Sequence, residues 1–257
     1  MSAVRSAPSF HSPRPKARRL SVGVGSGMLG VAIAALGMAP PLEAAGRAVA
    51  FPTTDGRTVA GLMFDAPARP APAVVLVPML GRPRDDWQAV AERLAEANIG
   101  ALALELPGTA LPAEAAELQR WHEPIGAAVA YLAARPMEVQ PGAIGVAGAS
   151  LGASLAVLAA AADPAVRSIA LVSPSLDYRG VRIELPFAQY GSRPALLMAS
   201  VHDPYAARSI RVLAQDAAGP REVRWSSAPA HGTILLARDG DLVRQLVEWF
   251  QRTLGVA

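Results

Sequence analysis

Short apolar runs alternate with segments of helical period from about residue 48 to the C-terminus, and this alternation limits the fold more than any other feature of the sequence. The apolar runs cover residues 73–78, 99–105, 143–147, 168–173 and 195–201, and a less apolar run covers 221–226. Strands that are apolar throughout are typical of parallel sheets covered on both faces. The sequence therefore predicts an α/β domain with a mostly parallel, doubly wound sheet and helices on both faces.

The segments between these runs have the spacing of amphipathic or buried helices. We expect helices at 87–94, with Asp85 as the N-cap, and at 113–134, 151–162, 206–217 and 242–254. Ahead of them, residues 48–52 and 58–64 flank a Thr-Asp-Gly turn, which predicts an antiparallel hairpin at the N-terminal edge of the sheet. We find no internal repeat and no Gly/Ser-rich linker after residue 47, so we expect one domain over residues 47–257.

The positive charge of the chain is concentrated in residues 1–45. This segment holds five basic residues and one acidic residue, whereas the remainder holds 19 basic and 20 acidic residues. The high isoelectric point, about 9.8, is therefore a property of the leader. The body has no stripe of Lys and Arg that could follow phosphates, and we expect no nucleic-acid partner.

Residues 1–46 have the organisation of an export signal and a linker. A basic segment is followed by the uncharged apolar run 20–38 and by Ala-Pro-Pro at 39–41. The pair Arg18 and Arg19 resembles a twin-arginine signal. We expect a periplasmic or extracellular protein with no stable membrane association after signal removal. The alternative is an uncleaved anchor, because the 19 residues of 20–38 are close to the roughly 20 that span a bilayer.

The pentapeptide 148–152 has the form G-x-S-x-G and lies between a predicted strand and a predicted helix. This is the context of a nucleophile elbow, in which a sharp turn exposes the serine hydroxyl and leaves no room for side chains at the flanking glycines. Ser150 is thus the candidate nucleophile. A plain glycine-rich turn is the other interpretation. A dinucleotide-binding loop is disfavoured, because the glycines at 145, 148 and 152 do not have its spacing.

A serine hydroxyl needs a base to become nucleophilic, and the base needs an acid to orient it. Among the four histidines, His231 lies in a loop before the last predicted helix and is the candidate base. Asp203 directly follows the predicted strand 195–201 and is the candidate acid, with Asp177 as the alternative. The order Ser150, Asp203, His231 is the one the elbow fold requires. The competing interpretations are an incidental loop histidine at 231 and an ordinary helix cap at 203.

With these motifs the chain resembles the α/β-hydrolase superfamily, in particular its small, lidless, esterase-like members related to dienelactone hydrolases. The resemblance extends from about residue 50 to the C-terminus. It implies Ser150 as nucleophile, His231 as general base and acid, and Asp203 as the orienting carboxylate. It implies no cofactor and no metal. The absence of cysteine independently excludes disulfides, cysteine nucleophiles and thiolate metal sites.

The oxyanion hole is the least regular part of the resemblance. Members commonly carry His-Gly before the donor loop, whereas this chain has Pro78 and Met79 there. Because backbone N–H groups do the binding, we assign the donors to Leu80 and Leu151, with Met79 as a substitute for Leu80.

The resemblance implies a serine esterase that acts on a small-molecule ester. Only about twenty residues, 174–194, separate two predicted strands where a large lid could be inserted, which favours small or accessible substrates. Two alternatives stay open: a secreted, hydrolase-like binding domain without catalysis, and an amide or peptide hydrolase of the same fold. Five aromatic side chains could line a pocket or fill the core: Trp87, Trp121, Phe187, Tyr190 and Tyr205.

Overall fold

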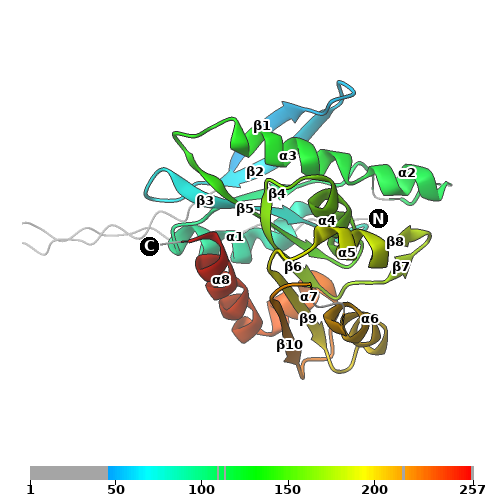
Figure 1. Ribbon diagram of the computed structural model, residues 1–257. Coiled ribbons are helices and arrows are strands. Elements are labelled where there is room, and N and C mark those ends of the chain that lie inside the picture. Colours follow the sequence, from blue (N-terminus) through cyan, green and yellow to red (C-terminus); the bar gives the residue numbers. More distant parts are fainter. Residues whose placement is uncertain (1–45, 109, 113, 216–217, 256–257) are drawn as a thin grey trace, which may run out of the picture. The chain divides into compact units, whose positions relative to one another are not determined.

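A computed structural model describes residues 46–108, 110–112, 114–215 and 218–255 (Figure 1). Residues 1–45 of the predicted leader, including the apolar run 20–38, lie outside the described residues. Within the described ranges, no helix combines the length and the apolar composition needed to cross a membrane.

An eight-stranded sheet forms the centre of the described chain. Its strands are β1 (Arg47–Pro52), β2 (Thr58–Phe64), β3 (Ala71–Val77), β4 (Gly100–Leu104), β5 (Val139–Ala149), β6 (Val166–Val172), β9 (Ala195–Ser200) and β10 (Arg221–Ser226). Their order is β1-β2-β4-β3-β5-β6-β9-β10. Strand β2 runs antiparallel to β1 and β4, and the other pairs are parallel. The predicted sheet and its N-terminal hairpin are confirmed.

Helices cover both faces of this sheet. They are α1 (Gln88–Glu96), α2 (Ala115–Arg120), α3 (Glu123–Ala133), α4 (Leu151–Ala162), α5 (Glu184–Tyr190), α6 (Pro204–Gln215), α7 (Gly232–Arg238) and α8 (Gly240–Leu254). Successive side chains of β3 point to opposite faces of the sheet. Val75 and Val77 pack in a core with α3 to α6, and Val74 and Leu76 pack in a second core with α1, α7 and α8. The helices on both faces are thus confirmed.

The predicted helix 113–134 is wrong as a single element. Helix α2 ends at Arg120, and α3 begins at Glu123. Pro124 occupies the first turn of α3, where its missing N–H costs nothing, whereas inside a continuous helix its ring would clash with the preceding turn. Asp85 is not a helix cap either. The short 3₁₀ turn Arg84–Trp87 precedes α1, and no side chain caps either element.

Three short elements follow β6 and one short helix precedes α8, and the sequence predicts none of them. Strands β7 (Asp177–Tyr178) and β8 (Val181–Arg182) form a small hairpin, and α5 packs beside α4. The segment 174–194 holds only these pieces, so the expectation that it carries no large lid is confirmed. Helix α7 has seven residues and begins immediately after His231.

Candidate active site

The turn between β5 and α4 holds Ser150 in a strained backbone conformation, with φ of 53° and ψ of −120°. The two glycines of the motif make this turn possible. A Cβ on Gly148 would lie 2.2 Å from the carbonyl oxygen of Gly152, and a Cβ on Gly152 would lie 2.4 Å from the carbonyl oxygen of Pro78. Neither position accepts a side chain. The turn therefore has the geometry of a nucleophile elbow.

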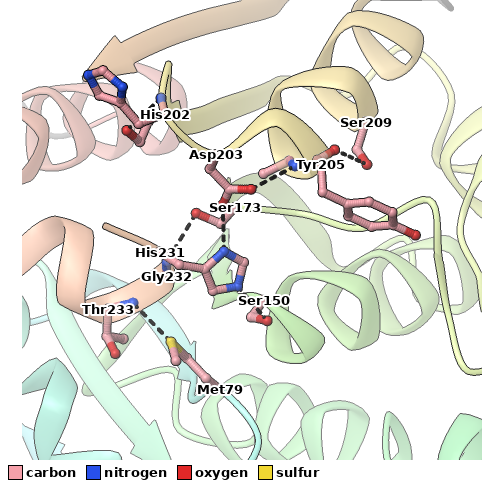
Figure 2. Close-up of polar contacts among 12 residues, drawn as sticks. Met79, Ser150, Ser173, His202, Asp203, Tyr205, Ser209, His231, Gly232 and Thr233 are labelled. Carbon is pink, nitrogen blue, oxygen red and sulfur yellow. Dashed lines mark hydrogen bonds and ion pairs between the residues drawn. The ribbon is translucent and has the colours of Figure 1, made fainter. Parts of the chain in front are cut away.

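His231 lies between Ser150 and Asp203 (Figure 2). Its Nε2 is 2.8 Å from the Oγ of Ser150, 81 residues away in sequence, and its Nδ1 is 2.5 Å from the Oδ2 of Asp203. An ionised carboxylate can only accept a hydrogen bond, so Nδ1 of His231 is the protonated ring nitrogen and donates a hydrogen bond to Asp203. In this tautomer Nε2 is the acceptor for the serine hydroxyl. The sequence-predicted residues thus form one hydrogen-bonded chain.

Asp203 is fixed by its own position at the start of α6. Its Oδ1 accepts a hydrogen bond of 3.1 Å from the backbone N–H of Ala206, and its side chain is 14% exposed. The helix-cap interpretation and the acid interpretation of Asp203 are therefore compatible, because one carboxylate oxygen serves the helix and the other faces His231.

The alternative acid, Asp177, lies elsewhere. Its exposed carboxylate accepts the N–H of Gly180 and pairs with Arg182, and these two interactions lower its pKa. The structure places Asp203, and not Asp177, against the imidazole of His231.

Ser173, which no sequence motif indicates, and Met79, which the sequence suggests only for the oxyanion hole, hold the loop that carries His231. The backbone N–H of Gly232 donates to the Oγ of Ser173 at 3.0 Å, and that of Thr233 donates to the sulfur of Met79 at 3.3 Å (Figure 2). Ser173 is buried and adopts a positive φ of 51° at the end of β6. No local motif indicates a role for Ser173, because its partner, Gly232, is 59 residues away in sequence.

The two expected oxyanion donors come from the ends of adjacent strands. Val77 of β3 is paired with Gly148 of β5, so the turn holding Leu80 and the start of α4 are neighbours. Leu151 is the first residue of α4, where a backbone N–H has no intrahelical acceptor. Gly152 lies against the Pro78 carbonyl, which keeps the two segments together. Met79 turns its side chain toward Thr233.

Solved structures with a similar fold include three hydrolases. The dienelactone hydrolase from Anabaena variabilis has a TM-score of 0.63 and 18% identity, over 81% of this chain and 97% of that one. The carboxylesterase EstE1, from a metagenomic library, has a TM-score of 0.62 and 19% identity, over 81% of this chain and 87% of that one. The Pyrococcus furiosus esterase Pf2001 has a TM-score of 0.65 and 14% identity, over 81% of this chain and 93% of that one. This chain has the α/β-hydrolase fold. No protein-family model matches the sequence, and no curated protein matches it.

In an α/β-hydrolase fold, reacting groups collect beyond the carboxyl ends of the strands. Here an open hollow of about 600 Å³ lies at that edge, between the turn after β3 and the segment after β4. Its lining includes Met79, Arg82, Leu106 and Pro107. A larger hollow, about 720 Å³, lies between α1, α7 and α8. Neither hollow is lined by Ser150, Asp203 or His231, but only the smaller one lies at the carboxyl ends of the strands.

Most of the aromatic side chains belong to the core of the α/β-hydrolase fold. Trp87, Phe187 and Tyr190 are at most 1% exposed, so the interpretation of these three as pocket walls is wrong. Trp121 borders a hollow of about 320 Å³ beside the segment after β4. Tyr205 is 58% exposed, and its hydroxyl donates to the backbone oxygen of Asp177. Among the described residues, no group of three or more His, Asp and Glu side chains could hold a metal ion.

Proposed function

We propose that this protein is a serine hydrolase that cleaves carboxylic esters of small or accessible substrates. The observation that carries the proposal is the position of His231, whose two ring nitrogens contact the hydroxyl of Ser150 and the carboxylate of Asp203. A nucleophile in contact with a base, and that base in contact with an orienting acid, is the arrangement that acyl transfer requires.

In the first half of the proposed reaction, Nε2 of His231 takes the proton of Ser150 as its Oγ attacks the ester carbonyl carbon. The carbonyl oxygen becomes an oxyanion, and Asp203 stabilises the imidazolium that forms. Collapse of the tetrahedral intermediate breaks the bond to the alcohol, which receives the proton from Nε2. The acyl group is then esterified to Ser150.

In the second half, water takes the place of the alcohol. His231 removes a proton from the water, whose oxygen attacks the acyl carbon, and the same proton returns to Oγ when the bond to Ser150 breaks. The carboxylic acid leaves, and the hydroxyl and the neutral imidazole are restored.

We assign the oxyanion hole to the backbone N–H groups of Leu151 and Leu80, with Met79 as the substitute for Leu80. The adjacent strand ends and the close packing of Gly152 on Pro78 support this assignment. Losing one such donor typically costs about a hundred- to a thousand-fold in turnover.

We propose that the open hollow of about 600 Å³ beside Met79 receives one end of the substrate, because it lies at the same edge of the sheet as Ser150 although Ser150 does not line it. Nothing larger than a short hairpin and the short α5 is inserted at 174–194, which supports access for small esters rather than a deep lipid tunnel.

A fluorophosphonate probe and a panel of nitrophenyl esters of rising acyl length test the proposal together. We expect the probe to label Ser150, and turnover to fall once the acyl chain exceeds the hollow. Ser150→Ala is the matched control for both assays. A folded wild-type protein that resists the probe, while a control hydrolase reacts, would support the binding-domain alternative. Faster cleavage of nitroanilides than of matched esters would support the amide-hydrolase alternative.

We also propose that residues 1–46 are an export signal and linker, removed to leave a periplasmic or extracellular enzyme. The basic residues ahead of the uncharged run 20–38 support this proposal. Mass spectrometry of the protein isolated from its native host should show an N-terminus near residue 47. An intact leader in the membrane fraction would support the anchor alternative. Replacing Arg18 and Arg19 with lysine should block export if the twin-arginine route is used.

A further inference from the structure

A hydrogen bond links the 3₁₀ turn Arg84–Trp87 to the segment that carries His231. The Oγ1 of Thr233 donates to the Oδ2 of Asp86 at 3.0 Å, although the two residues are 147 positions apart. Thr233 is buried and stands two positions after His231, in the first turn of α7. The bond therefore acts on the backbone next to the imidazole.

Asp86 is itself held in place. Arg82 donates from Nε to Oδ2 at 2.7 Å and from its terminal nitrogen to Oδ1 at 2.9 Å, a two-point contact with defined geometry. The carboxylate of Asp86 is only 15% exposed, and it raises the pKa of the Arg82 guanidinium. The backbone N–H of Arg82 donates to the carbonyl of Met79, so Asp86 is tied to the turn that holds the expected oxyanion donor Leu80.

The imidazole of His231 needs such support from its backbone. The histidine side chain is 46% exposed, and its ring nitrogens are engaged by Asp203 and Ser150. Helix α7 has only seven residues, too few to form a stable helix alone. Contacts of the backbone and side chain just after His231 must therefore fix where α7 begins.

We propose that Asp86 is a positioning residue for His231 that acts through the hydroxyl of Thr233. This inference rests on the proposed function, because the position it controls is that of the general base. The bond from Thr233 to Asp86 ties the start of α7 to the 3₁₀ turn Arg84–Trp87, which follows the turn that holds the proposed oxyanion donor Leu80. The base and the oxyanion donor thus keep a fixed separation around the substrate carbonyl.

Thr233→Val and Thr233→Ser form a matched pair for the test. Valine keeps the shape of the side chain and removes the hydroxyl, whereas serine keeps the hydroxyl. We expect Thr233→Val to lower kcat about tenfold, since a small misplacement of a reacting group has effects of that order or larger. KM should stay within about twofold, because Thr233 does not bind substrate in this scheme. Thr233→Ser should retain most of the wild-type kcat.

Asp86→Ala tests whether the effect passes through the same bond. We expect a loss in kcat similar to that of Thr233→Val, and we expect the double variant Asp86→Ala/Thr233→Val to be no slower than the slower single variant. If the fold-loss in kcat of the double variant equalled the product of the two single losses, the two side chains would act independently. That result would overturn the proposal.

Thr253→Val is the control for loss of a hydroxyl as such. The hydroxyl of Thr253, on α8, is 2.9 Å from the Oγ of Ser168 and 2.9 Å from the carbonyl oxygen of Trp249. Ser168 pairs with Gly145 of β5, five positions before Ser150. The Thr253→Val variant should keep kcat. Equal losses in Thr253→Val and Thr233→Val would indicate general loosening of the fold and would contradict a specific role for Asp86.

A spectroscopic measurement separates this proposal from the proposed function. With ¹⁵N-labelled histidine, the protonated Nδ1 of His231 should give a resonance that is assigned by its loss in His231→Gln. We expect that resonance to broaden or shift in Thr233→Val and Asp86→Ala and to persist in Thr233→Ser, whereas His122 stays unchanged. This readout needs no substrate. A changed resonance in a protein that cleaves no ester would retain the positioning role and reject the esterase. An unchanged resonance together with full activity would reject the positioning role alone.

Discussion

Gly152 packs directly against the carbonyl oxygen of Pro78. A Cβ at position 152 would lie 2.4 Å from that oxygen, and no real side-chain carbon comes so close to a backbone oxygen. The contact joins the start of α4 to the turn after β3. It therefore sets the separation between Ser150 and the turn from which Leu80 comes.

Gly152→Ala should damage both the fold and the site. The added carbon meets backbone at the end of β3 and cannot be accommodated by a side-chain rotation, so we expect a loss of about 3 kcal/mol or more in the free energy of unfolding. Turnover should fall at least about a hundredfold in whatever protein remains folded. Chemical denaturation and ester hydrolysis on the same preparation measure the two effects. An alanine variant with wild-type stability would contradict the geometry described.

Gly126→Ala is the matched control for that substitution. Gly126 lies inside α3, and a Cβ there would have no atom within 4 Å. Alanine is a better helix former than glycine, so we expect this variant to gain about 0.5–1 kcal/mol in the free energy of unfolding, with unchanged turnover.

Ser150→Ala should abolish ester hydrolysis and leave the melting temperature close to that of the wild-type protein. The hydroxyl contacts His231, but the half-buried serine side chain adds little packing, and its backbone bond to Val172 is kept. Differential scanning calorimetry and a nitrophenyl ester assay check both parts. Wild-type turnover in the variant would remove Ser150 from the mechanism.

Asp203→Asn should preserve the fold and reduce kcat by about four orders of magnitude, because an amide favours the wrong tautomer of His231. The asparagine side chain could still cap α6 through its oxygen. Asp177→Asn is the control, since the carboxylate of Asp177 bonds Gly180 and Arg182 while the imidazole bonds Asp203. Steady-state kinetics on both variants measure the effect. If Asp177→Asn were the variant that lost activity, the acid would be misassigned.

Arg193→Met should destabilise the protein without changing KM. Its guanidinium donates to the carbonyl oxygens of Asp163, Val166, Ala160 and Tyr190, and it stacks over the ring of Tyr190. Leaving these partly buried carbonyls without a donor should cost about 2–4 kcal/mol in the free energy of unfolding. Urea denaturation measures the loss.

Arg208→Met controls for the change of charge, because Arg208 is exposed on α6. Its effect on the free energy of unfolding should stay within about 0.5 kcal/mol. Equal losses in the two arginine variants would show that the carbonyl contacts of Arg193 contribute little.

Local signals account for the parts of the fold that the sequence predicts well. The apolar runs become strands because each is buried on both faces, and the turn at 148–152 is dictated by two glycines that no other residue can replace. The break before α3 also had a local signal in Pro124. Because apolar residues have helical spacing on both sides of Pro124, the sequence nevertheless predicted one continuous helix.

Contacts between distant residues account for what the sequence analysis missed. Met79 is conspicuous only as a departure from the usual motif, yet its sulfur accepts the N–H of Thr233, 154 positions later. Asp86 stands beside Asp85 and has the appearance of a helix-start acid, but it bonds Arg82 and Thr233. Helix α7 is too short to give a periodic signal.

The sequence by itself determined the α/β class, the sharp turn at Ser150 and the chain order of the three candidate side chains, because each can be read from residues along the chain. The tertiary structure alone decided that Asp203 rather than Asp177 faces His231, and that Asp86 and Ser173 hold the histidine loop. The physical reason is that a hydrogen bond depends on separation in space, and segments far apart in sequence meet only when the sheet brings their strand ends to one edge.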